Sequence, residues 1–245
     1  MIFKLLVIGH FVGDFYLQSD KMVEDKKKSL KILIGHCIIY TLPILFIGLI
    51  IITKSEIIDF IKFILSVLLL HGIIDYGKLI IEKKNKFKYR YVFFLLDQLL
   101  HTIIIYIFIA IFKIEGGKYI DIFNKSYELS NYNIYIKSLI MALICAKPAS
   151  IFVATVFEEI PKVNEKEDNK NKAKIGSLIG VLEREIILIL GIMGQYGSIG
   201  YVLAAKSLAR FKQLEEQDFA EKYIVGTLLS AIIAICCIVV YSNIL

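Results

Sequence analysis

The chain has 245 residues, 57% of them hydrophobic, with a net charge of +6 and a mean hydropathy of +0.68. A soluble domain of this length does not need so much apolar surface, so the composition indicates an integral membrane protein with the lipid bilayer as its partner. The positive charge does not indicate a nucleic-acid partner, because the basic residues lie mostly in loops between apolar runs, where they set membrane orientation.

Apolar runs long enough to cross a bilayer, which takes about 20 helical residues, recur along the chain. They predict an all-α, polytopic transmembrane bundle in a single integral-membrane domain, 1–245, with a four-helix His/Asp half at 1–113 and a C-terminal helical half at 134–245. The predicted spans are 2–18, 31–53, 57–81, 91–113, 134–157, 176–194, 197–211 and 222–243. Because the seventh is short and glycine-rich, the count is seven or eight.

The first run is expected to be a span and not a signal peptide, since His10 and Asp14 interrupt it and no cleavage site follows. Lysine and arginine gather in alternate loops, at 21–28, 82–90, 161–174 and 206–213. The positive-inside rule places these loops in the cytoplasm. The sequence therefore predicts a multi-pass protein of the cell membrane with its N-terminus outside.

All four histidines fall in the first four predicted spans. Three have an aspartate four residues away, in the pairs His10–Asp14, His71–Asp75 and Asp97–His101, whereas His36 has Tyr40 at that spacing. Residues four apart share one face of a helix. At a rise of 1.5 Å per residue, all seven side chains fall in one layer of the cytoplasmic half, and we expect them to meet.

Glycines flank three of these histidines, at Gly9, Gly35 and Gly72. A glycine lets neighbouring helices approach closely. This pattern favours a site built between four helices.

The cost of burying carboxylates favours a metal at this layer. Each carboxylate at span depth is unfavourable by about 2.5–3.5 kcal/mol, and no cation lies close in sequence to Asp14 or Asp97. Divalent ions would offset the charge, and imidazole with carboxylate suits zinc, manganese or iron. Seven candidate ligands are more than the four that one tetrahedral site accepts, so one or two ions are expected. The predicted metal ligands are His10, Asp14, His36, His71, Asp75, Asp97 and His101.

Two other interpretations use the same residues. Each His–Asp pair could be an interhelical hydrogen bond, a contact that averages about 0.6 kcal/mol in membranes. The layer could also relay protons or ions, since transporters bury aspartate and histidine too.

Three stretches, HFVGDFYLQSDK, HGIIDYGK and DQLLH, resemble the N-terminal motifs of an uncharacterised bacterial integral-membrane family, domain of unknown function 3307. The later stretch GVLEREIILILGIMGQYGSIGYVLAAKSLARFKQLEEQDFAEKYIVGTLLS resembles the C-terminal half of its longer members. A weaker similarity of His/Asp layout links the chain to bacterial membrane-bound metal-dependent hydrolases, and implies metal ligands carried by membrane helices. The family itself implies no activity, so the second resemblance is an analogy for function.

These observations predict a metal-dependent membrane hydrolase that acts on a phosphoester or other anionic substrate, a small molecule or a lipid, from the cytoplasmic side. Asp14 or Asp97 is the predicted general base. A set of cations in the second half could bind the anionic group, or could serve as interhelical ion pairs and orientation anchors: Lys147, Arg184, Lys206 and Arg210. Because Glu183 and Arg184 are adjacent on a helix, each is expected to have a different partner.

Two alternative functions remain at this stage. One is a transporter of divalent cations, or one coupled to protons. The other is a non-catalytic scaffold in which the metal only joins helices.

Overall fold

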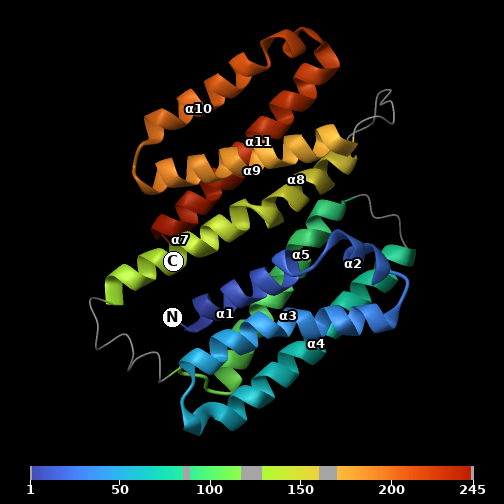
Figure 1. Ribbon diagram of the computed structural model, residues 1–245, viewed down its shortest axis with the longest axis vertical. Helices are drawn as coiled ribbons and strands as arrows, with labels where there is room; N and C mark the ends of the chain where they lie inside the picture. The colour runs from blue at the N-terminus through green and yellow to red at the C-terminus, as the bar shows by residue number, and fades with distance from the viewer. Residues whose placement is uncertain (1, 85–88, 117–128, 160–169, 244–245) are drawn as a thin grey trace. The chain divides into compact units, whose positions relative to one another are not determined.

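The computed structural model describes residues 2–84, 89–116, 129–159 and 170–243, and every regular element within them is helical (Figure 1). The all-α prediction is confirmed for this part of the chain. The residues divide into two compact units, Met1–Ile140 and Met141–Leu245. Parts of the predicted basic loops 82–90 and 161–174 lie outside the described residues.

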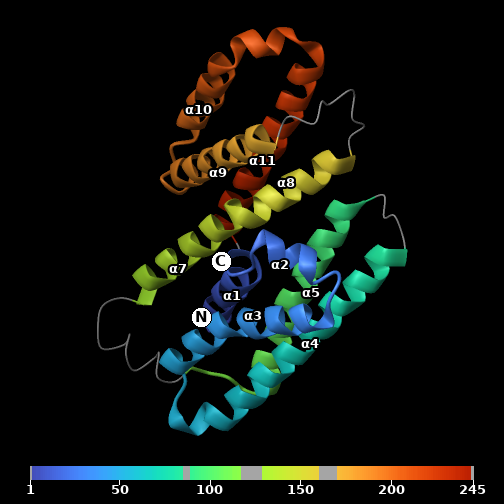
Figure 2. The ribbon, with the colours of Figure 1, turned by 45° about the vertical axis from the view of Figure 1, so that its right-hand side comes forward.

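The first unit is built around four helices that close into a ring. α3 contacts α1 and α4, and α5 contacts the same two helices, so each helix has two neighbours (Figures 1 and 2). A side chain that points inward from any of the four is therefore enclosed by the other three. The elements of this unit are α1 (Ile2–Phe11), the π-helix η1 (Val12–Tyr16), α2 (Asp20–Asp25), α3 (Leu30–Ile51), the 3₁₀-helix η2 (Lys54–Glu56), α4 (Ile57–Lys84) and α5 (Arg90–Ile111).

An apolar core fills one part of this ring. Leu6, Ile44, Phe63 and Ile105, one from each helix, are fully buried there. Burying such side chains contributes about 1.5–3 kcal/mol each relative to exposure to water. The core holds the four helices together beside the polar layer.

Glycines allow the close approach of α1 and its π-helical extension to α3. A Cβ at Gly9 would lie 3.0 Å from Ile44, and one at Gly13 would overlap the backbone carbonyl of Tyr40. A Cβ at Gly72 would lie 3.3 Å from Cys37 Sγ. The close approach expected at Gly9 and Gly72 is confirmed, but the expectation at Gly35 is wrong, because nothing lies within 4 Å of its Cβ position.

Five helical segments among the described residues are long and apolar enough to cross a membrane. They are Leu30–Ile51, Lys54–Lys83, Arg90–Ile111, Asn133–Glu159 and Gln217–Asn243. The other three predicted spans are helical but shorter or more charged. The first is α1 with its π-helix, the sixth carries Glu183, Arg184 and Glu185, and the seventh is the 14-residue α10. The structure thus shows five membrane-length helical segments among the described residues, and the count of seven or eight stays a prediction.

The second unit is centred on α9, which contacts α8, α10 and α11 (Figure 2). The predicted span 134–157 is two helices, since Pro148 has no N–H to donate to the preceding turn and the chain turns at Ala146. The elements are α7 (Leu129–Cys145), whose last residues belong to this unit, α8 (Lys147–Glu159), α9 (Lys170–Ile192), α10 (Tyr196–Ala209), the 3₁₀-helix η3 (Phe211–Glu215) and α11 (Gln217–Asn243).

Candidate metal centre

Asp14 lies in a π-helix and not in a regular α-helical turn. The Leu17 N–H donates to Val12 O at 2.9 Å, five residues back, and such wide turns occur frequently at functional sites. His10 and Asp14 both contact Gln98, but their other partners differ: Tyr40 for His10 and His36 for Asp14. Tyr40 and His36 both lie on α3, so His10 and Asp14 face the same two helices, α3 and α5, at different heights.

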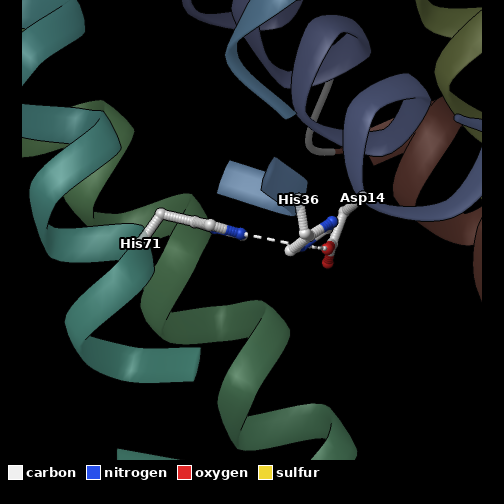
Figure 3. A group of neighbouring side chains, drawn as sticks. All are labelled: Asp14, His36 and His71. Atoms are coloured by element: carbon white, nitrogen blue, oxygen red, sulfur yellow. Dashed lines mark hydrogen bonds and ion pairs between the residues drawn. The ribbon is translucent and has the colours of Figure 1, made fainter. Parts of the chain in front are cut away.

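The closest gathering of ligand atoms surrounds His36 Nε2. This nitrogen lies 3.2 Å from His71 Nε2, 3.4 Å from Asp14 Oδ1 and 3.4 Å from Asp75 Oδ2. Figure 3 shows Asp14, His36 and His71 pointing toward one another from three separate elements. His71 Nε2 is also 4.0 Å from Asp75 Oδ2. Asp14, His36 and His71 each offer a ligand atom within 4.8 Å of the others, and Asp75 lies beside His36 and His71.

These spacings fit a small divalent ion. Ligand atoms in a tetrahedron about 2.0–2.1 Å from zinc are about 3.3 Å apart. The three distances from His36 Nε2, 3.2, 3.4 and 3.4 Å, are close to that value. A set of two imidazoles and two carboxylates also suits manganese or iron.

A second group of ligand atoms overlaps the first. His71, Asp75 and His101 each offer an atom within 4.8 Å of the others, and the rings of His71 and His101 are 4.4 Å apart. Asp97 Oδ1 lies 3.9 Å from His101 Nδ1. Because both groups use His71, the arrangement is one continuous cluster and not two separate sites.

Several buried atoms of this cluster have no hydrogen-bond partner. Such groups are rare in folded proteins and cost about 1–3 kcal/mol each, so these atoms can still bind water or an ion. The atoms, within the described part of the chain, are His36 Nδ1, His71 Nδ1, Asp97 Oδ1 and both ring nitrogens of His101. The seven predicted ligand residues are all buried, at 8% exposure or less.

Two residues that sequence reasoning did not assign to the site hold these side chains in place. Gln98 accepts from His10 Nε2 at 3.1 Å and donates to Asp14 Oδ2 at 3.0 Å, and Tyr40 OH lies 3.1 Å from His10 Nδ1. The Tyr40 ring stacks on His71 with centroids 3.7 Å apart. Tyr40 occupies the i+4 position after His36, and Gln98 lies within DQLLH, so both carried a sequence signal.

These contacts give His10 a role distinct from that of His36 and His71. Since Gln98 Oε1 can only accept, His10 Nε2 carries the proton and Nδ1 accepts from the Tyr40 hydroxyl. Both ring nitrogens are thereby engaged, which favours His10 as a support for Gln98 and not as a ligand.

Two lysines reach the carboxylates across the helices. Lys26 Nζ lies 2.9 Å from Asp75 Oδ2, and Lys78 Nζ lies 2.8 Å from Asp97 Oδ2. The absence of a cation near Asp97 in sequence was therefore misleading, because its partner comes from the next helix. With neutral histidines the three carboxylates and two ammonium groups leave one net negative charge, which one divalent ion is sufficient to offset.

The four cations predicted to bind an anion do not gather in this way. Arg184 donates to the carbonyl oxygens of Cys145 at 2.6 Å and Ala146 at 3.3 Å, and to the hydroxyls of Ser150 at 2.6 Å and Ser230 at 3.0 Å. Its guanidinium thus joins α9 to the α7–α8 turn and to α11.

Lys206 and Arg210 contact residues other than those that Arg184 binds. Lys206 pairs with Glu183 at 2.6 Å, so Glu183 and Arg184 have different partners, as expected. Arg210 donates to Gln213 at 2.9 Å, and Lys147 begins α8, half-buried. This geometry favours interhelical contacts over an anion clamp.

Together, these observations define an all-helical protein with five helices that could cross a membrane and a buried His/Asp cluster in its N-terminal unit. The chain belongs to the family described as Protein of unknown function (DUF3307), whose sequence profile matches residues 2–129. The match includes all seven predicted ligands, while the later stretch that resembles longer members lies outside it. No curated protein and no solved structure matches the chain. The comparisons thus give no support to the resemblance to metal-dependent hydrolases.

Proposed function

We propose that the protein is a metal-dependent membrane hydrolase whose single divalent ion is held by Asp14, His36, His71 and Asp75. The observation that carries this proposal is the gathering of three ligand atoms at 3.2–3.4 Å around His36 Nε2. Zinc, manganese and iron all suit the donor set. One ion is preferred to two because Lys26 and Lys78 already balance part of the negative charge.

The surrounding residues supply what hydrolysis needs besides the ion. A bound divalent ion lowers the pKa of water to about 7 and stabilises developing negative charge. Asp97 and His101, beside the four ligands, are the residues placed to accept a proton, since Asp97 Oδ1 and both His101 nitrogens have no hydrogen bond among the described residues. Asp14 acts as a ligand in this account and not as the base.

The substrate is proposed to be an anionic ester that reaches the site from the cytoplasmic side. Lys26 and Lys78 are more exposed than the carboxylates they bind, with 14% and 26% of their side chains accessible against 4% for Asp75 and 5% for Asp97. Ammonium groups at the edge of a metal centre favour an anionic substrate such as a phosphoester. The outside N-terminus and the crossings beyond the five membrane-length helices belong to the same proposal.

A specific observation favours a second candidate, proton-coupled transport. The contacts His10–Gln98–Asp14–His36–His71 form an unbroken polar chain through the ring of helices. The contact between the two Nε2 atoms at 3.2 Å also requires a hydrogen between them when no ion is bound there. Buried chains of this kind relay protons in pumps and transporters.

The test is an activity screen of the detergent-purified chain loaded in turn with zinc, manganese or iron. Phosphomonoesters, phosphodiesters and phospholipids are the substrates, and wild type is compared with His71→Ala and with the surface variant Lys62→Met. Turnover by wild type and Lys62→Met but not by His71→Ala supports the hydrolase. Proton flux in proteoliposomes without turnover supports the transporter, and metal binding with neither supports a structural metal.

A further inference from the structure

Lys26 approaches the polar layer from outside the ring of helices. It lies at the C-terminal end of the short helix α2, in the connection between the π-helix and α3. Its Nζ donates to Asp75 Oδ2 at 2.9 Å. With the Gln18 amide oriented to satisfy both of its groups, Gln18 accepts from the same ammonium at 3.0 Å and donates to Asp14 O at 3.0 Å.

The oxygen that accepts from Lys26 is also the one best placed to bind a metal. Asp75 Oδ2 lies 3.4 Å from His36 Nε2 and 4.0 Å from His71 Nε2. An ammonium and a divalent ion on one carboxylate oxygen repel each other, and this repulsion is strong at contact distance in a partly buried site. The two cations therefore compete for Asp75 Oδ2.

Lys78 differs in this respect. It binds Asp97 Oδ2, and Asp97 belongs to neither group of converging ligand atoms. Asp97 Oδ1 also remains without a hydrogen bond among the described residues. Lys78 can thus stay in place when the metal binds, whereas Lys26 cannot keep its full contact.

We infer that Lys26 is an intrinsic competitor of the metal, which lowers the affinity of the site and is released from Asp75 when the ion binds. This inference rests on the proposed metal centre and adds a regulatory element to it. The α2 connection, which carries Lys26, therefore changes its contacts with the ring of helices when the metal binds. The released ammonium is left beside the ion, where an anionic substrate would bind.

The test is zinc affinity of the detergent-purified full chain, measured by competition with a chromophoric chelator. Lys26→Met is compared with wild type and with Lys27→Met, which removes the same charge from an exposed position one residue away. A hydrogen bond to a charged group contributes about 1.5–3 kcal/mol, so Lys26→Met should bind zinc at least about tenfold more tightly. Lys27→Met should stay within about twofold of wild type.

Equal or weaker zinc binding by Lys26→Met, with wild type binding normally, overturns the inference and leaves the metal centre standing. Absence of zinc from every variant overturns the metal centre itself, and the inference with it. If Lys26→Met does not fold, Lys26→Gln keeps much of the side-chain length without the charge and carries the same expectation. In wild type, zinc should also speed acylation of Lys26 relative to Lys27 by an amine-reactive reagent, and an unchanged ratio with zinc bound contradicts the release.

Discussion

The two units bury charged groups in different ways. Around His36 in the first unit, ligand atoms face one another, and neighbouring buried nitrogens and oxygens have no hydrogen-bond partner among the described residues. Around Arg184 in the second unit, the guanidinium donates to two carbonyl oxygens and two serine hydroxyls. The first arrangement has the chemistry of a binding site, and the second has that of a structural contact.

This difference shows that buried charge alone does not identify a functional site. Arg184 is buried to about the same extent as the four histidines, with 2% of its surface exposed. What separates the two regions is whether the polar atoms have already found partners within the protein. The comparison can be tested by removing residues from each region and measuring both metal content and stability.

The largest effect is expected from His71→Ala. Removing one of four ligands should weaken zinc binding by about a hundredfold, given that four-ligand zinc sites contribute about 10–16 kcal/mol. The measurement is zinc affinity in detergent. His10→Gln is the matched control, because His10 is held by Tyr40 and Gln98. Equal losses in both variants would contradict the assignment of the four ligands.

In the second unit Arg184→Met should change stability and not metal content. Two carbonyl oxygens and two hydroxyls would lose their donor, and we expect the free energy of unfolding to fall by about 2–4 kcal/mol. Unfolding in sodium dodecyl sulfate, followed by circular dichroism, measures this. Lys206→Met should cost about 1 kcal/mol or less, because its pair with Glu183 is partly exposed. Loss of zinc from Arg184→Met would remove the distinction between the two regions.

Gly13→Ala should disturb the proposed metal centre through the backbone. A Cβ there would overlap the Tyr40 carbonyl, so the π-helix carrying Asp14 must move away from α3, and zinc affinity should fall about tenfold, or about 1.4 kcal/mol. Gly35→Ala is the control, since its Cβ has open space and alanine favours a helix by up to about 1 kcal/mol. Similar zinc affinities for both alanine variants would show that the π-helix does not position Asp14.

The smallest effect is expected from Tyr40→Phe. The ring can still stack on His71, but His10 Nδ1 loses its hydroxyl partner. A neutral hydrogen bond contributes about 0.5–1.5 kcal/mol. The loss acts on the ligand Asp14 only indirectly, through His10 and Gln98, so zinc affinity should fall about threefold. Tyr106→Phe, on an exposed part of α5, should have no effect. A hundredfold loss in Tyr40→Phe would instead give the hydroxyl a direct part in binding.

The sequence predicted the helical class and the gathering of the His/Asp residues because both follow from periodicity. Spacing of four residues paired His71 with Asp75, and only similar depth along the predicted spans placed His36 beside them. The π-helix at Asp14 and the turn at Ala146 were not predicted, since each depends on how one helix packs against the next. Glycine spacing likewise could not separate Gly13, which contacts α3, from Gly35, which faces open space.

Partners from distant segments were the other part that sequence reasoning missed. Lys26 was interpreted only as a basic loop residue that sets orientation, yet it binds Asp75, 49 residues away. Lys78 was close in sequence to Asp75 but binds Asp97 on the next helix. These two lysines balance two of the three carboxylates, and for this reason we propose one bound ion where the sequence left one or two open.

The most direct test of the metal centre is the metal-to-protein ratio of the detergent-purified wild-type chain, measured by elemental analysis after supplementation with zinc, manganese and iron. The ligand atoms gathered around His36 Nε2 and the single net negative charge predict one transition-metal ion per chain. A chain that carries none of the three metals would contradict the metal centre, and the polar layer would then be a proton relay or a structural network.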